Sequence, residues 1–168
     1  MARRDVPQHA LALITSSLQG ASVGQLSLIE VKQMKVNGAC HCGRITYEAE
    51  VEPERSGICH CTDCQVLTGS AFRVTVPTVA GTFRLLTGTP TAYLKTTADS
   101  GGRRRHAFCP NCGTPVYAGA DEDTPATRNL RVGCLAQREH LAPKRRIWCK
   151  SAVSWSQDIG SLPGIPKQ

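Results

Sequence analysis

The sequence predicts a mainly β domain: a small antiparallel strand assembly stapled by zinc, with one short helical turn. Three observations support this fold class. Short runs alternate apolar with polar side chains, which is the period of half-buried strands. Glycine and proline separate many of these runs, as they do in turns between strands. Seven of the nine cysteines stand in tight clusters, and in a chain without an export signal such clusters more often bind metal than form disulfides.

The predicted strands follow one another between residues 44 and 151. The clearest is RITYEAEV at 44–51, where every second side chain is apolar. Seven further runs are AFRVTV at 71–76, TFRLLT at 82–87, TAYLKT at 91–96, RRHAFC at 104–109, TPVYA at 114–118, NLRVGCL at 129–135 and RIWCKS at 146–151. The helical turn is expected at TDCQVLTG, residues 62–69, ending at Gly69.

Residues 1–33 differ from the rest of the chain. They contain no cysteine and show no sustained helical or strand period. We expect a disordered extension there, or a translation start placed too early, since Met34 directly precedes the first patterned segment; a weak helix over 25–34 is the alternative. Residues 34–168 are expected to form one zinc-binding domain, because the chain is long enough for one core and too short for two.

Charge and hydropathy exclude several classes of protein. The formal charge of +7 is concentrated at residues 103–105 and 144–146, and such runs usually lie solvated on a surface. Aromatic residues make up only 5% of the chain, so no stacking platform for nucleic acid is evident, and nucleic acid is not an expected partner. No apolar run approaches the roughly 20 residues that span a bilayer. The N-terminal run HALALI is shorter than a typical secretory core, so we expect a cytoplasmic protein.

The seven clustered thiols divide between two metal sites as four plus three. The clusters are Cys40 with Cys42, then Cys59, Cys61 and Cys64, and finally Cys109 with Cys112. Spacing slightly favours a local pairing, in which the first pair joins Cys61 and Cys64, because familiar zinc ligands are close in sequence. In the other grouping the two outer pairs form one site, and the central three cysteines stand alone.

The central trio raises the question of a fourth ligand. A structural zinc site has four protein ligands, whereas a catalytic zinc takes three and leaves one position to water or substrate. A structural site would be completed by one of four candidates: His60, His106, Cys134 or Cys149. A redox trio without metal is a third reading. The side chains of His41 and His60 are expected to point away from the metal, toward the surface or the ligands' surroundings, because neighbours in an extended segment face opposite sides.

Other residues near the trio are expected to have structural roles, with a role at the site as the alternative. Thr62 or Asp63 is expected to cap the helical turn, with hydrogen bonds to the thiolates as the alternative for these two and for Gln65. Trp148 and Trp155 are expected in the core rather than around a pocket. The arginines at 103–105 are a possible attraction for carboxylates of a ligand.

Four segments resemble the glutathione-dependent formaldehyde-activating enzyme family, whose domain is shared with centromere protein V: NGACHCGRITYEAEV, CHCTDCQVLTGSAF, RRHAFCPNCGTPVY and IWCKSAVSW. The resemblance implies a zinc-bearing β assembly of the β-tent type over residues 34–168. It also implies a structural zinc on the outer pairs, namely Cys40, Cys42, Cys109 and Cys112. The trio of Cys59, Cys61 and Cys64 is then the catalytic site, with an exchangeable or catalytic second zinc.

The resemblance further implies a carbon-sulfur lyase or synthase-type enzyme. Its partner would be a small-molecule thiol such as glutathione, and its product an aldehyde adduct such as S-hydroxymethylglutathione, made from formaldehyde. The alternative is a noncatalytic zinc module that binds a partner or nucleic acid through its basic loops. Salt dependence of binding, and the effect of Cys61→Ser on turnover with the fold intact, distinguish these two functions.

Overall fold

The computed structural model describes residues 32–97, 101–122 and 124–167. The expectations for residues 1–31, an extension or misplaced start and most of the weak helix, lie outside this part of the chain. The described strands are β1 Met34–Ala39, β2 Thr46–Val51, β3 Gly57–Cys59, β4 Arg73–Pro77, β5 Arg84–Thr87, β6 Thr91–Lys95, β7 Arg104–Phe108, β8 Pro115–Ala120, β9 Asn129–Arg131 and β10 Arg145–Ile147. The α-helix is α1 Thr62–Thr68, and the 3-10 helices are η1 Pro53–Arg55, η2 Val132–Cys134, η3 Arg138–His140, η4 Cys149–Ser151, η5 Ser154–Gln157 and η6 Ile159–Ser161.

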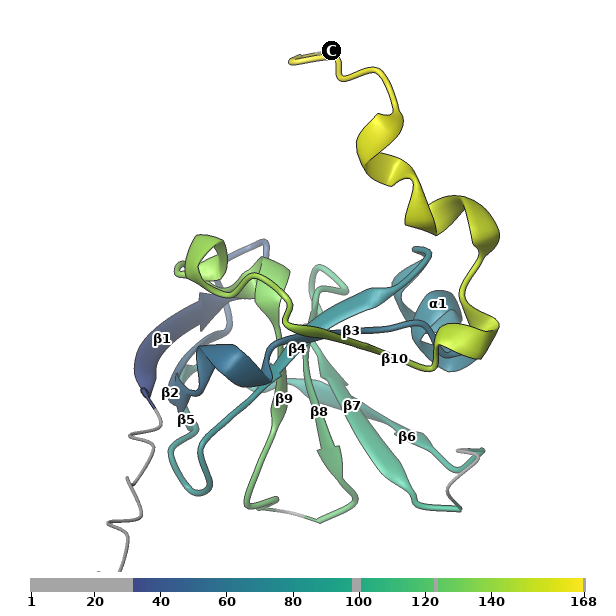
Figure 1. The fold of residues 1–168 in the computed structure, drawn as a ribbon. Helices are drawn as coiled ribbons and strands as arrows, with labels where there is room; N and C mark the ends of the chain where they lie inside the picture. Colours follow the sequence, from purple (N-terminus) through teal and green to yellow (C-terminus); the bar gives the residue numbers. More distant parts are fainter. Residues whose placement is uncertain (1–31, 98–100, 123, 168) are drawn as a thin grey trace, which may run out of the picture. The chain divides into compact units, whose positions relative to one another are not determined.

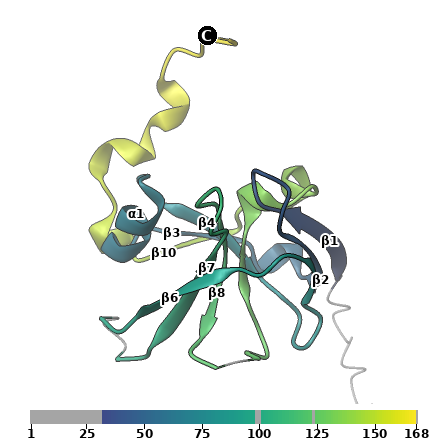
Figure 2. The ribbon, with the colours of Figure 1, turned by 180° about the vertical axis from the view of Figure 1, so that it is seen from behind.

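The strands form two sheets, so the predicted mainly β class with one short helix is confirmed. One sheet has the order β1-β2-β5 and is antiparallel throughout. The other has the order β10-β3-β4-β9-β8-β7-β6, and its pairs are antiparallel except for β10 beside β3. The helix α1 lies at the end of β3 and β10, next to the 3-10 turn that follows β10 (Figures 1 and 2).

The alternation predicted for residues 44–51 gives β2 its buried face. Tyr47, Ala49 and Val51 are buried, while the residues between them are partly exposed. They pack with apolar side chains from both sheets and from the loops after β9, including Val36, Val76, Val116, Leu130, Leu135 and Leu141. Each side chain of this kind contributes about 1.5–3 kcal/mol when fully buried. The two sheets therefore share one core.

Strand β1 lies against β2 because Gly38 leaves room for the ring opposite it. Gly38 pairs with Tyr47, and a Cβ atom at Gly38 would stand 2.1 Å from the Tyr47 ring. No larger residue fits without displacing Tyr47, which is completely buried. The short strand β3 also forms without a strong periodic signal, since its hydrogen bonds come from β4 and β10.

Two predicted strands end earlier than the sequence pattern suggests. The run at 129–135 is a strand only through Arg131 and then turns into η2. The run at 146–151 ends at Ile147, because Trp148 adopts the left-handed conformation with a φ of 58° and the 3-10 helix η4 follows. The core position expected for the two tryptophans is wrong: Trp148 is 50% exposed and Trp155 is 63% exposed. Within the described residues, no helix is long and apolar enough to cross a bilayer.

Candidate functional site

The two outer cysteine pairs meet at the ends of two hairpins. Cys40 and Cys42 lie in the turn between β1 and β2, and Cys109 and Cys112 lie in the turn between β7 and β8. The four sulfur atoms are all within 4.8 Å of one another. This grouping is the one that the family resemblance implied, and the local pairing of the first pair with Cys61 and Cys64 is wrong. The prediction from sequence spacing failed because these four cysteines are far apart in the chain and are brought together by the packing of distant strands.

The geometry of the four-cysteine cluster fits a zinc ion. The Sγ atom of Cys42 is 3.5 Å from that of Cys40 and 3.8 Å from that of Cys109. Four sulfurs at Zn–S distances of about 2.3 Å stand roughly 3.8 Å apart in a tetrahedron. Cys40 and Cys109 are buried, Cys112 is partly exposed and Cys42 is exposed, so an ion held here would be shielded from water on one side. The cluster has the features of a closed structural site.

The surroundings of this cluster favour thiolates. The Thr114 hydroxyl accepts a hydrogen bond from the backbone N–H of His41, so its own proton is free for the Cys112 sulfur 3.2 Å away. That hydrogen bond is the main reason why the pKa of Cys112 is lowered to about 5. The backbone N–H of Ile45 donates to the sulfur of Cys40. Zinc binds cysteine as thiolate, so these donors prepare the site for the metal.

The central trio is assembled over only six residues. Cys59 ends β3, Cys61 is the N-cap of α1, and Cys64 lies in the first turn of that helix. The three sulfur atoms lie within 4.8 Å of one another, and each residue is partly exposed. The backbone N–H of Cys64 donates to the sulfur of Cys61, 3.3 Å away. The capping expected of Thr62 or Asp63 is therefore wrong, since a cysteine of the trio takes that position.

The three thiols of the trio differ in pKa. A hydrogen bond from Cys64 is the largest influence on Cys59 and lowers its pKa, whereas burial raises the pKa of Cys61. The pKa of Cys64 is raised, first by its hydrogen bond to Cys59 and then by burial, against the opposing charge of Arg73. Without a metal, Cys59 is the first of the three to carry a negative charge. Three sulfurs at this separation, open on one side, suit a three-ligand zinc.

No fourth ligand joins the trio among the His, Cys, Asp and Glu side chains that the structure describes. His60 is buried, and both of its ring nitrogens lack a hydrogen-bond partner within this part of the chain. Its ring packs edge-on against Phe72, so it faces neither the surface nor the metal cluster. Cys134 donates to the carbonyl of Pro115, and Cys149 is exposed.

The segment after β10 holds the trio in place through backbone carbonyls. The side-chain amide of Gln65 donates to the carbonyl oxygens of His60 and Ser151, at 2.7 and 2.8 Å. The Ser151 hydroxyl also donates to the carbonyl of His60. Gln65 thus positions the backbone of the trio and makes no hydrogen bond to a thiolate. These contacts tie α1 to η4, which lies beside it in Figure 1.

A cluster of basic side chains borders the trio, and its two arginines were not among the predicted site residues. Arg73 on β4 pairs across the sheet with Cys59, and Arg131 lies on the next strand, β9. One terminal nitrogen of each guanidinium is 3.4 Å from Nδ1 of His106. Nearby, Lys95 forms an ion pair with Asp63 of α1. The sequence did carry a signal for these two residues: each is an arginine within a largely apolar predicted strand, at 71–76 and at 129–135.

The family model for glutathione-dependent formaldehyde-activating enzymes matches residues 35–151, which include all seven clustered cysteines. The chain belongs to this family. The sequence resemblance to formaldehyde-activating enzymes is thereby confirmed, and the seven thiols form two clusters that can each hold a metal ion. No curated protein matches the chain.

A solved structure supports the fold of this formaldehyde-activating domain. It is the crystal structure of a Rhodobacter sphaeroides protein, determined as a structural genomics target. The two chains are 21% identical, and the match covers 67% of this chain and 99% of the other, with a TM-score of 0.50. At this identity the likeness concerns the fold alone.

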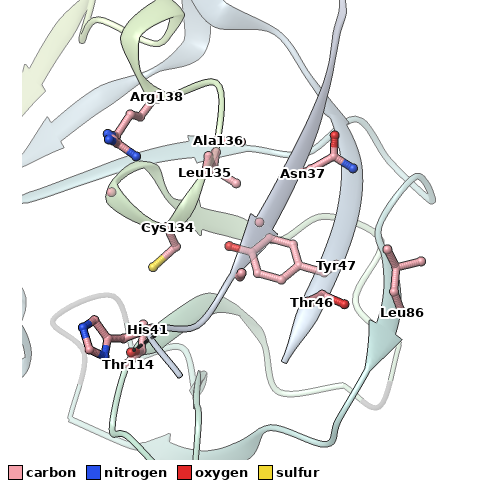
Figure 3. Close-up of a pocket in the computed structure, with 13 residues that line it drawn as sticks. Asn37, His41, Thr46, Tyr47, Leu86, Thr114, Cys134, Leu135, Ala136 and Arg138 are labelled. Atoms are coloured by element: carbon pink, nitrogen blue, oxygen red, sulfur yellow. Dashed lines mark hydrogen bonds between the residues drawn. The ribbon is translucent and has the colours of Figure 1, made fainter. Parts of the chain in front are cut away.

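The formaldehyde-activating domain also has a pocket of about 570 Å³ away from the trio. Figure 3 shows His41, Tyr47 and Cys134 among the side chains around it. Its lining includes Thr114, which contacts the four-cysteine cluster, and none of the trio cysteines. Burial raises the pKa of Tyr47, so this phenol stays protonated. Neither cysteine cluster contributes a cysteine to the lining of this pocket.

Proposed function

We propose that the protein joins a small thiol, such as glutathione, to an aldehyde such as formaldehyde, or cleaves the resulting adduct as a carbon-sulfur lyase. The thiol sulfur forms a bond to the carbonyl carbon while its proton leaves. The π electrons of the carbonyl move to oxygen, which takes up a proton, so that glutathione and formaldehyde become S-hydroxymethylglutathione. The observation that carries this proposal is the open trio of Cys59, Cys61 and Cys64.

The residues proposed to hold the second zinc are Cys59, Cys61 and Cys64, as distinct from the structural set of Cys40, Cys42, Cys109 and Cys112. Zinc bound by three thiolates would lower the pKa of an added thiol and orient its sulfur. The protein's own contribution is position: Gln65 and Ser151 fix the backbone of the trio through His60. Such positioning converts an encounter between two small molecules into a favourable arrangement.

Charge around the trio supports the same role. The Arg73 guanidinium favours the ionised form of Cys64, and Cys59 carries the first negative charge of the trio. Of the three thiols only Cys59 has a lowered pKa, and a partly exposed thiol of this kind beside a cationic side chain is typical of reactive cysteines. All three cysteines of the trio are partly exposed, whereas the four-cysteine cluster has two buried members, one partly exposed and one exposed. A small thiol thus has access to the trio.

The first test is the zinc content of the full chain by elemental analysis, with and without glutathione. We expect two zinc ions per chain, falling to one when glutathione is added, because a competing thiol displaces an ion held by three ligands more readily than one held by four. Cys61→Ser is the matched control: it should contain one zinc ion per chain before glutathione is added and still one afterwards. Two ions indifferent to glutathione would make the trio a second structural site.

Turnover is the second readout. The rate at which ¹³C-formaldehyde and glutathione form their adduct, measured by NMR, should exceed the spontaneous rate with the wild-type chain and fall to it with Cys61→Ser. A wild-type chain that never exceeds the spontaneous rate would leave the noncatalytic zinc module as the better function. At one of the basic loops of that alternative, Arg103 and Arg105 share a single carboxylate, Asp121, which leaves the loop with net positive charge.

A further inference from the structure

Three basic side chains from separate strands converge beside the trio. Arg73 lies on β4, Arg131 on β9 and His106 on β7. The Nη1 atom of Arg73 and the Nη2 atom of Arg131 are each 3.4 Å from the Nδ1 atom of His106. Both arginines are more than nine-tenths buried, with 5% and 7% of their surface exposed. Long-range strand pairing, and not local sequence, brings the two positive charges together.

The two guanidinium groups have no carboxylate partner among the described residues. Within residues 32–97, 101–122 and 124–167, no carboxylate forms an ion pair with Arg73 or Arg131, and the Nε atom of each is buried without a hydrogen-bond partner. The nearby Lys95 and Asp63 neutralise each other. A buried charge without a partner is strongly unfavourable, so such groups are normally paired or bind a ligand.

His106 does not neutralise the charge of the two arginines, although it holds one N–H group of each guanidinium in place. A guanidinium only donates hydrogen bonds, so Nδ1 of His106 accepts and the ring is neutral. Burial and then the charges of Arg131 and Arg73 lower the pKa of His106 to about 4. Burial and Arg73 lower the pKa of Arg131 to about 9, which leaves it charged at neutral pH. Two cations and one neutral acceptor thus remain.

A cavity of suitable size opens at this cluster. It has a volume of about 170 Å³, and its lining includes Arg73, His106, Arg131 and Tyr93, together with Leu67 of α1. Since one water occupies about 30 Å³ in the liquid, the cavity has room for a carboxylate and a few atoms attached to it. Guanidinium groups match carboxylates especially well, because their parallel N–H donors meet both oxygens.

The negative charge of a zinc-loaded trio would neutralise only part of the positive charge of the two arginines. Three thiolates with one Zn²⁺ carry a formal charge of about −1, whereas Arg73 and Arg131 together carry two positive charges. Two residues of the cavity lining adjoin the trio: Arg73 pairs across the sheet with Cys59, and Leu67 lies in α1 together with Cys64. An anion in this cavity would therefore lie beside a molecule bound at the trio.

We propose that Arg73, His106 and Arg131 form a binding site for one oxyanion, and that this oxyanion is a carboxylate carried by the thiol substrate. This inference rests on the proposed function for its second part only. It adds a selectivity: thiols that bear a carboxylate are preferred to neutral thiols of similar size. The arginines are binding residues for the substrate and take no part in bond formation.

Paired probes test the site. Binding of 3-mercaptopropionate, 2-mercaptoethanol, propionate and inorganic phosphate to the full zinc-loaded chain is measured by calorimetry, with zinc release followed in parallel. We expect 3-mercaptopropionate to bind at least tenfold more tightly than 2-mercaptoethanol. In Arg73→Gln and in Arg131→Gln this preference, taken as the ratio of the two dissociation constants within the same variant, should fall below threefold. Arg84→Gln, which changes an exposed arginine paired with Glu48, is the control and should keep the full preference.

The outcomes separate the inference from the function it rests on. An unchanged preference in both folded arginine variants overturns the carboxylate site, whether or not the chain turns over thiols. If phosphate binds as tightly as 3-mercaptopropionate and needs the same arginines, the site takes free anions and the substrate part is overturned. If no thiol binds the trio but propionate binding still needs the arginines, the anion site stands and the proposed function fails. If a glutamine variant does not fold, lysine replaces it at the same position, and the preference should still fall because lysine keeps the charge but lacks the paired N–H donors of arginine.

Discussion

A comparison of Cys112→Ser with Cys61→Ser tests whether the two cysteine clusters have different roles. Both side chains are partly exposed, so the direct loss of packing is similar. The two clusters close loops of very different length. The four-cysteine cluster joins Cys42 to Cys109, 67 residues apart, whereas the trio joins Cys61 to Cys64, three residues apart. Loop-closure entropy grows as (3/2)RT ln n, so the ion on the four-cysteine cluster offsets about 3 kcal/mol more of it than an ion on the trio.

The helix cap makes this difference larger. Cys61 is the N-cap of α1, and serine is a favoured N-cap residue, so Cys61→Ser retains the hydrogen bond to the N–H of Cys64. We expect Cys112→Ser to lower the free energy of unfolding by at least about 3 kcal/mol. Cys61→Ser should lower it by less than about 1 kcal/mol.

The measurement is urea unfolding followed by circular dichroism, with zinc content determined for each variant before unfolding. Cys112→Ser should lose the more tightly held zinc, and Cys61→Ser the exchangeable one. Equal losses of stability in the two variants would refute the reasoning, because the trio would then be as much a structural staple as the outer pairs.

Two further predictions concern the core and the basic cluster. Gly38→Ala should destabilise the fold by about 1–3 kcal/mol in urea unfolding, because its Cβ would overlap the Tyr47 ring; Gly133→Ala, which meets nothing within 4 Å, is the control, and equal effects would contradict the packing. The pKa of His106, about 4 in the folded chain, lies below its ordinary 6.5, so the neutral ring favours folding above pH 6.5 and this contribution is lost as the pH falls through 4. An NMR titration of the ring with a midpoint at or above pH 6 would contradict this prediction.

Local patterns predicted much of the fold correctly. The alternation in residues 44–51 identifies the buried face of β2, because side chains in a strand face opposite sides in turn. The helical turn ends at Gly69 in the left-handed conformation, as expected for a helix C-terminus. Local patterns failed where the backbone departs from its sequence trend, as at Trp148, whose left-handed conformation ends β10 and leaves the ring exposed.

The class of this protein can be read from its amino-acid sequence: a strand-rich chain with seven clustered thiols, in an order specific to one family. Which clusters meet, and that Arg73, Arg131 and His106 converge beside the trio, became known only from the folded chain. The difference lies in the range of the interactions. Strand period, turns and short ligand spacings are set by neighbours in the chain, whereas the order of strands in a sheet depends on packing between residues far apart.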